Sequence, residues 1–284
     1  MASSREIKRR IKSVTNIEQI TKAMKMVAAA RLRRAQERAN SSKPYAKKIA
    51  EVLSRVAAQS QEAAHPLLAR REVKNIAYLV IGSDKGLAGA YNTNAMKEAV
   101  AQVSSHDNAH LITAGRKARD YFAHRNYKID EQYSGFSERP SYQHAIMLAN
   151  DLSAKFQDGT YDEIYVVYTQ FYSPLVYTPT TIRLLPVEAP ELEPTGNMGD
   201  EYIFEPSAPE ILERLVPRYV ETLLYATLMQ SAASELGARM TAMSAATDNA
   251  KDLISELTLN YNKVRQAGIT REITEIVGGA EALK

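Results

Sequence analysis

The chain has 284 residues, a formal net charge of +3, 45% hydrophobic residues and no cysteine. A small net charge with ample apolar content indicates a folded globular protein and excludes global disorder. The absence of cysteine excludes disulfides, thiolate metal sites and a cysteine nucleophile. The uncharged stretch 222–234 is shorter than the ~20 apolar residues that a membrane span needs, and the polar, basic first residues predict no signal peptide.

The first 60 residues predict one long helix. Before Gly82 the chain has no glycine and only two prolines, Pro44 and Pro66, so little interrupts a helix there. An apolar stripe at helical spacing is formed by Ile7, Ile11, Val14, Ile17, Ile20, Met24 and Val27, followed by Ala28, Leu32, Ala35 and Ala39. The early spacing averages less than ~3.5 residues, so this stripe is expected to drift around the helix.

Positive charge is concentrated at the start of the chain. Residues 1–43 contain twelve Lys and Arg against three Glu, a net charge of +9. A basic helix binds nucleic acid, a membrane surface or acidic protein, or is simply solvated. Because this stretch has no aromatic residue for stacking on bases, an acidic protein surface fits at least as well as nucleic acid.

Residues 75–209 predict a central α/β, Rossmann-like domain, because strand and helix patterns alternate there. The expected strands are 76–81, 110–114, 127–133, 163–169 and 176–185, and the expected helices are 94–104, 116–124 and 141–156. Alternation of this kind indicates a mostly parallel sheet with helices on its faces. Pro179 favours an edge position for the last strand, and the Pro- and Glu-rich stretch 186–209 is expected to be a loop.

Residues 210–284 predict a second long helix, running from about residue 210 to about residue 276. Its apolar residues recur at alternating steps of four and three, which is a heptad seam that requires a partner helix. The seam is formed by Leu236, Met240, Met243, Thr247, Ala250, Ile254, Leu257, Tyr261 and Val264. The simplest partner is the first helix, so we expect segments 1–60 and 210–284 to form an antiparallel coiled coil.

The sequence contains no convincing catalytic or metal motif. The loop 82–89 follows a strand with the spacing GxxxGxxG, which matches neither the P-loop nor the dinucleotide fingerprint. A tight turn with positive-φ glycines explains it better than a nucleotide site. The five histidines lack metal-ligand spacing and are interpreted as surface residues. We therefore expect no catalytic residue, no metal and no cofactor.

Three parts of the chain resemble the gamma subunit of F-type ATP synthases, bacterial type. The first is IKRRIKSVTNIEQITKAMKMVAAARLRRAQ at 7–36, and the middle one is SDKGLAGAYN at 83–92. The last comprises ASELGARMTAM at 233–243, ATDNA at 246–250, YNKVRQAGIT at 261–270 and EIVGGA at 275–280. The resemblance covers essentially the whole chain and is most specific at its two ends.

The resemblance implies a non-catalytic rotor shaft in a proton-translocating F-type ATP synthase. The implied partners are the alpha and beta subunits of the catalytic ring, the epsilon subunit and the c-subunit ring, with one copy of this chain per complex and no nucleic acid. The implied location is the cytoplasmic face of the cell membrane, peripheral through the complex. In such a motor, ion-driven rotation of the shaft shifts the beta subunits between conformations.

The resemblance also implies positions that contact the stator. These are Lys22, Met24, Lys25, Arg239, Arg265, Gln266, Thr270 and Glu272. For Met24, a seam position within the helix pair is an alternative of nearly equal weight. The competing functional classes are a basic coiled-coil protein that binds nucleic acid or acts as a scaffold, and an α/β enzyme with a nucleotide at loop 82–89.

Overall fold

The computed structural model describes residues 4–59, 65–106, 108–188 and 207–282. It forms two compact units, one of Met1–Ala28 with Met240–Lys284 and one of Ala29–Arg239. Two long helices, α1 (Ser4–Gln59) and α5 (Ala208–Ala282), contribute to both units. The expected fold class, long antiparallel helices with a central α/β domain, is confirmed. The segment boundaries at 60, 75 and 210 stay a prediction.

The second unit contains a five-stranded sheet with the strand order β3-β2-β1-β4-β5. Its strands are β1 (Ile76–Ile81), β2 (Ala109–Ala114), β3 (Ile129–Tyr133), β4 (Glu163–Phe171) and β5 (Tyr177–Leu185). The first four strands pair in parallel, and β5 pairs antiparallel with β4 at the sheet edge, where Pro179 was expected. Of the predicted loop 186–209, residues 189–206 lie outside the described residues.

The shorter helices lie between the strands in the chain. They are α2 (Tyr91–Val103), α3 (Arg116–Ala123) and α4 (Tyr142–Gln157), with a short 3-10 helix η1 (Pro66–Leu68) before β1. The prediction for α2 began three residues late, at Asn94. Ser141 precedes α4, and its backbone N–H donates to His144 Nδ1 at 3.0 Å. His144 is therefore part of a helix cap, which corrects its interpretation as a surface histidine.

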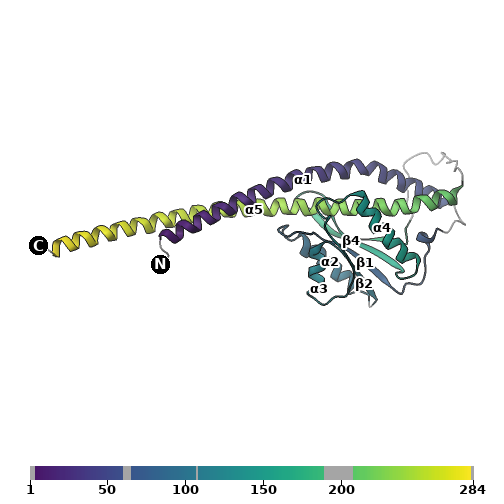
Figure 1. Cartoon of the computed structure of the whole chain (residues 1–284). Helices are drawn as coiled ribbons and strands as arrows, with labels where there is room; N and C mark the ends of the chain where they lie inside the picture. Colours follow the sequence, from purple (N-terminus) through teal and green to yellow (C-terminus); the bar gives the residue numbers. More distant parts are fainter. Residues whose placement is uncertain (1–3, 60–64, 107, 189–206, 283–284) are drawn as a thin grey trace. The chain divides into compact units, whose positions relative to one another are not determined.

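The sheet is covered on both faces (Figure 1). In β1, alternate residues Ala77, Leu79 and Ile81 join one core with α4, the end of α1 and the start of α5. The other three residues of β1 join a second core with α2 and α3. All six residues of β1 are buried. A central parallel strand buried on both faces explains why its sequence is a continuous apolar run.

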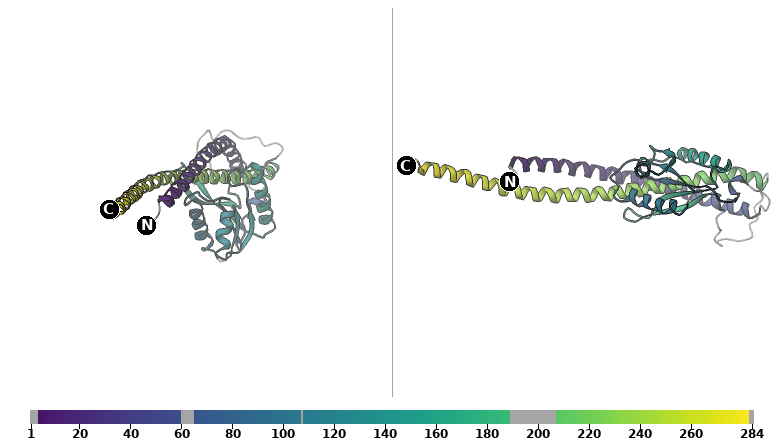
Figure 2. Two further views of the ribbon diagram at one scale, coloured as in Figure 1. Left: turned by 60° about the vertical axis from the view of Figure 1, so that its left-hand side comes forward. Right: turned by 90° about the horizontal axis from the view of Figure 1, so that it is seen from below.

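In the first unit, α1 and α5 lie side by side and run antiparallel, as Figure 2 shows in two views. Thr247 Oγ1 donates to Thr21 Oγ1 at 2.8 Å, and Lys25 Nζ donates to Ser244 Oγ at 2.9 Å. The partner number on α5 falls as the number on α1 rises, which identifies the direction. Every predicted seam residue of this unit from Met240 to Val264 is buried or half-buried, so the heptad prediction for α5 is confirmed.

The stripe predicted for α1 is wrong at three positions. Ile17, Ile20 and Val27 are 50%, 58% and 50% exposed, whereas Thr21 and Ala28 are buried. The physical reason is the seam of α5, which selects α1 residues at alternating steps of four and three. Positions 7, 11, 14, 21 and 28 fit that register, and Ile17, Ile20 and Val27 do not.

The antiparallel register predicts a specific cross-link. The double variant Thr21→Cys with Thr247→Cys is expected to form an intramolecular disulfide, because the two hydroxyl oxygens are already 2.8 Å apart. The native chain has no cysteine to interfere. In the control, Thr21→Cys with Ile254→Cys, the partner lies about 10 Å further along α5, beyond disulfide reach. Non-reducing electrophoresis and peptide mapping measure the result; equal cross-linking of both variants would contradict this register.

Candidate functional site

The predicted contact residues of α1 belong to the first unit and do not share one side of the helix, because Lys22 and Met24 are two residues apart. Lys22 and Lys25 are exposed and Met24 is half-buried. Lys25 is tied to α5 through Ser244, whereas no ion pair or hydrogen bond engages the Lys22 side chain among the described residues. The exposed Ile17 and Ile20 add apolar surface to this part of α1. Basic and apolar side chains are thus exposed on different sides of α1.

The last part of α5, residues 265–280, is named here the terminal face. Every residue in it is exposed. It contains four predicted contact residues, Arg265, Gln266, Thr270 and Glu272. The Thr270 hydroxyl donates to the Gln266 carbonyl at 3.0 Å, so these two residues occupy successive turns of one helix face.

The terminal face also carries four large apolar side chains that are 47–72% exposed. They are Ile269, Ile273, Ile276 and Val277. Their i, i+4, i+7 and i+8 spacing places them on one side of the helix, but none of them falls on the heptad that ends at Val264, whose next positions are 268, 271, 275 and 278. An exposed apolar stripe of this kind marks an interaction surface.

The eighth predicted contact residue, Arg239, is placed differently from the other seven. Its side chain is only 6% exposed, and its guanidinium pairs with Glu235 at 2.6 Å and with Glu138 at 3.1 Å. It also donates to the carbonyl oxygens of Gly86 at 3.2 Å and Lys85 at 3.4 Å. Its role as a stator contact stays a prediction, but its geometry engages it with its own chain.

Glu138 extends this cluster to α1. It lies in the loop between β3 and α4, where it also pairs with Arg31 of α1 and, at 3.0 Å, with Lys85. Burial raises the pKa of Glu138, but the Lys85 hydrogen bond and the charges of Arg31 and Arg239 outweigh burial, so this pKa lies below its ordinary value. The group of Arg31, Lys85, Glu138, Glu235 and Arg239 is named here the Arg239 junction.

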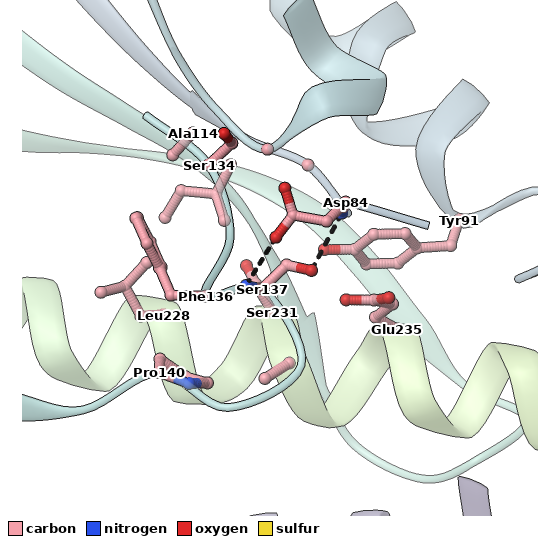
Figure 3. Close-up of a pocket in the computed structure, with 14 residues that line it drawn as sticks. Asp84, Tyr91, Ala114, Ser134, Phe136, Ser137, Pro140, Leu228, Ser231 and Glu235 are labelled. Carbon is pink, nitrogen blue, oxygen red and sulfur yellow. Dashed lines mark hydrogen bonds between the residues drawn. The ribbon is translucent and has the colours of Figure 1, made fainter. Parts of the chain in front are cut away.

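Glu235 is the most deeply buried acid of the junction, with a side chain 1% exposed. Its Oε2 atom is buried and has no hydrogen-bond partner among the described residues. Burial raises the pKa of this carboxyl to about 7, against the opposing charge of Arg239. Figure 3 shows Glu235 of α5 beside Tyr91 of α2, at a cavity that Asp84 and Ser137 also line.

The cavity has a volume of about 10 Å³, roughly that of one water molecule. The Asp84 carboxylate lines this cavity and accepts hydrogen bonds from the backbone N–H groups of Gly135 at 2.9 Å and Ser137 at 3.1 Å. Burial raises the pKa of Asp84, but these backbone hydrogen bonds outweigh it and place the pKa below its ordinary value. Asp84 therefore holds the loop between β3 and α4 against the loop after β1.

The glycines of loop 82–89 act by different means. Gly89 has a φ of +54°, as expected for a tight turn, but Leu87 also has a positive φ, +62°. Gly82 is required by packing instead, because a Cβ there would lie 3.0 Å from Ala118 Cβ and 3.1 Å from Met96 Cε. The expectation that positive-φ glycines explain this loop is thus only partly right.

Most contacts of the Arg239 junction cannot be predicted from the local sequence. The pair Glu235 and Arg239 has the i, i+4 spacing of a helical ion pair, so this contact had a visible signal. Glu138 and Arg31 are 107 residues apart, and nothing in the local sequence connects them. The prediction of surface histidines is also wrong at two further positions, because His65 Nδ1 accepts a hydrogen bond from the backbone N–H of Leu67 and His110 Nδ1 lies 2.5 Å from Asp130 Oδ2.

The raised pKa of Glu235 predicts a pH-dependent stability. Between pH 4.5, the ordinary value, and about 7, the folded chain retains a proton that the unfolded chain has released. The free energy of unfolding is therefore highest below the ordinary pKa. It falls as pH rises from 4.5 through about 7, by on the order of 3 kcal/mol in total. Glu235→Gln cannot titrate, so the stability of the native chain relative to this variant should fall by that amount from pH 5 to pH 8.

Urea unfolding at the two pH values measures this difference. Glu256→Gln, which replaces an exposed glutamate of the same helix, is the matched control, and its difference from the native chain should stay constant. The charged neighbours Arg239 and Glu138 are present in all three proteins. A constant difference for Glu235→Gln would contradict the prediction.

Among the helices that the structure describes, none has an apolar stretch long enough to cross a bilayer.

Comparisons with known proteins give a consistent family. The family model described as ATP synthase matches residues 3–283. The "ATP synthase gamma chain" of Desulforamulus reducens is 50% identical, with all of both chains covered, and that of Desulfitobacterium hafniense is 47% identical with the same coverage. An "ATP synthase gamma chain, sodium ion specific" from Acetobacterium woodii is 43% identical over 98% of each chain.

Solved structures agree at the level of the fold. A chain of the Euglena gracilis mitochondrial ATP synthase (OSCP, F1 and c-ring, rotational state 3) matches with a TM-score of 0.70 and 18% identity, over 99% of this chain and 94% of that chain. A chain of the Tetrahymena thermophila mitochondrial ATP synthase central stalk and c-ring has a TM-score of 0.60 and 23% identity, over 80% of this chain and 99% of that chain.

Proposed function

This chain belongs to the family of ATP synthase gamma chains, and from that premise we propose that it is the rotor shaft of a proton-translocating F-type ATP synthase. It couples ion-driven rotation to ATP synthesis and hydrolysis and carries no catalytic residue of its own. Its partners are the alpha and beta subunits, the epsilon subunit and the c-subunit ring, with one copy per complex. The complex holds it at the cytoplasmic face of the cell membrane. The alternative of a nucleic-acid-binding or scaffold protein has no support among the relatives.

The observation that carries this proposal is the terminal face of α5. Helix α5 continues there with four large apolar side chains exposed, including Ile273 and Ile276. Exposed apolar surface of this extent favours a partner that covers it. A ring of alpha and beta subunits enclosing this end of the helix would bury Ile269 to Val277 and bring Arg265, Gln266, Thr270 and Glu272 against the stator.

The first part of α1 supplies the second contact. Lys22 and Lys25 contribute positive charge, and Met24 and Ile20 contribute apolar surface, on different sides of this helix. A turning shaft with different chemistry on its sides binds the beta subunits unequally. Unequal binding of this kind shifts the conformational equilibrium of each beta subunit, which is how rotation and nucleotide affinity are coupled.

Assembly tests the proposal directly. The chain is co-expressed with the alpha and beta subunits from one of the bacteria whose gamma chains are described above. The purified products are assayed for subunit composition and ATP hydrolysis. We expect a complex with one copy of this chain and an ATPase rate well above that of the chain alone, which should show no turnover. Failure to assemble, or turnover by the isolated chain at the rate of the complex, would overturn the proposal.

A further inference from the structure

The guanidinium of Arg239 connects four separate segments of the second unit. It pairs with Glu235 one turn earlier on α5, donates to the carbonyls of Lys85 and Gly86 after β1, and pairs with Glu138 before α4. Glu138 in turn pairs with Arg31 of α1. One buried side chain thus joins both long helices to two loops at the carboxyl ends of strands in the sheet.

The remaining contacts between the sheet and α5 are mostly apolar. The shared core contains Leu212, Val216, Val220, Leu224 and Leu228 of α5. Apolar packing is strong but non-directional, so by itself it resists sliding and turning of a helix weakly. Near the junction, Ser234 Oγ donates to the Thr169 carbonyl at 3.0 Å, and Ser231 Oγ accepts from the Thr169 N–H at 3.2 Å. Charged hydrogen bonds from a planar guanidinium add a fixed geometry that these neutral contacts lack.

The position of Arg239 along α5 is also informative. Arg239 is the last residue of the second unit, and α5 continues as part of the first unit from Met240. All five residues of the Arg239 junction therefore lie within the second unit. Arg239 is surrounded by two carboxylates and two carbonyl groups of its own chain, and its side chain is 6% exposed. Little of it remains free to contact another subunit.

We propose that Arg239 is a positioning residue that locks the sheet and its two loops to the α1 and α5 segments of the second unit, so that the sheet and these helices turn together. This inference rests on the proposed rotor function for its consequence, but not for its geometry. It changes the expected role of Arg239 from a stator contact to an internal clamp of the rotor. Loss of the clamp leaves the ATP-hydrolysing ring intact and loosens the connection through which torque passes.

Hydrogen exchange on the full chain tests the geometry without any partner. In Arg239→Gln, the amides of residues 84–87 and 135–139 are expected to exchange at least tenfold faster than in the native chain, while those of β1 stay protected. Arg239→Lys keeps the charge but loses the planar guanidinium with its paired N–H donors, so its exchange rates should lie between those of the native chain and Arg239→Gln. Arg119→Gln, which removes a partly exposed arginine ion pair on α3, is the matched control with unchanged exchange. Native-like exchange in Arg239→Gln overturns the proposal.

A second variant guards against failure of Arg239→Gln to fold. Glu138→Gln keeps Arg239 paired with Glu235 and removes the charge that joins Arg31, Lys85 and Arg239. Faster exchange of residues 84–87 and 135–139 in this variant is expected, and native-like exchange again overturns the clamp.

The assembled complex tests the consequence. With Arg239→Gln, ATP hydrolysis and its KM should stay near the native values, while protons pumped per ATP hydrolysed should fall at least threefold. A purely structural defect would lower assembly and hydrolysis together, and that result overturns the positioning role. If the native chain itself fails to assemble, the proposed rotor function is wrong. The exchange experiment on the isolated chain still tests whether Arg239 clamps the loops to the two helices.

Discussion

Replacing Gly115 with alanine is expected to lower the free energy of unfolding by more than about 4 kcal/mol, or to prevent folding. Gly115 has a φ of +115°, and a Cβ at this position would lie 2.3 Å from the carbonyl oxygen of Gly82. Neither backbone segment can move away easily, because both are hydrogen-bonded. The Gly82 N–H donates to the Ala114 carbonyl oxygen at 2.8 Å, and the Gly115 N–H donates to the Tyr133 carbonyl oxygen at 2.7 Å. The clash is therefore built into the ends of three parallel strands.

Gly135→Ala is the matched control for this variant. Gly135 also has a positive φ, +98°, but a Cβ there meets no atom within 4 Å. Only the conformational cost of a positive φ remains, which is about 1–2 kcal/mol. Urea unfolding followed by tyrosine near-ultraviolet circular dichroism measures both variants. Equal losses of stability would show that the contact with Gly82 does not matter.

Triple alanine replacement of Arg265, Gln266 and Thr270 is expected to slow ATP hydrolysis by the assembled complex about 30-fold. This corresponds to a loss of about 2 kcal/mol, the lower end of the range for removing a charged hydrogen-bonding partner from a buried interface. The three side chains are exposed in the chain itself, so its helical content and thermal unfolding should not change. The comparison of turnover with stability separates a contact role from a structural role.

The control for this variant is alanine at Thr93, Asn94 and Lys97, three exposed residues of α2. It removes a similar amount of exposed polar surface from another part of the chain and should leave turnover unchanged. Circular dichroism, subunit composition and steady-state ATPase rates are measured for both. Normal turnover in the terminal variant would make these residues solvated bystanders, and loss of folding would make them structural.

Local sequence patterns were sufficient for most of the architecture. The two long helices follow from the scarcity of glycine and proline at both ends, and the alternation of apolar runs with helical patterns predicts the parallel sheet. The heptad predicted from Met240 to Val264 is confirmed, because the spacing of apolar residues along one helix defines which side it buries. The α1 stripe was wrong at Ile17, Ile20 and Val27, since which side of α1 is buried depends on the register that α5 imposes.

The Arg239 junction illustrates what local patterns cannot contain. The pairing of Glu235 with Arg239 is visible as an i, i+4 spacing, and resemblance to the gamma subunit family marks Arg239 as a functional position. That resemblance predicts a contact with another subunit, whereas the buried guanidinium contacts Glu138 and two backbone carbonyls of its own chain. Only the folded sheet brings these loops to α5.

By itself, the sequence determined the fold class, the direction of the helix pair and the family, because these depend on periodicity, breakers and motifs that are written along the chain. The tertiary structure alone decided which polar groups are buried and which glycines are indispensable. Burial and close approach arise between segments such as Arg31 and Glu138, or Gly82 and Gly115, that are distant in sequence. Their energies depend on distances of a few ångström, which no pattern of residue types along one segment specifies.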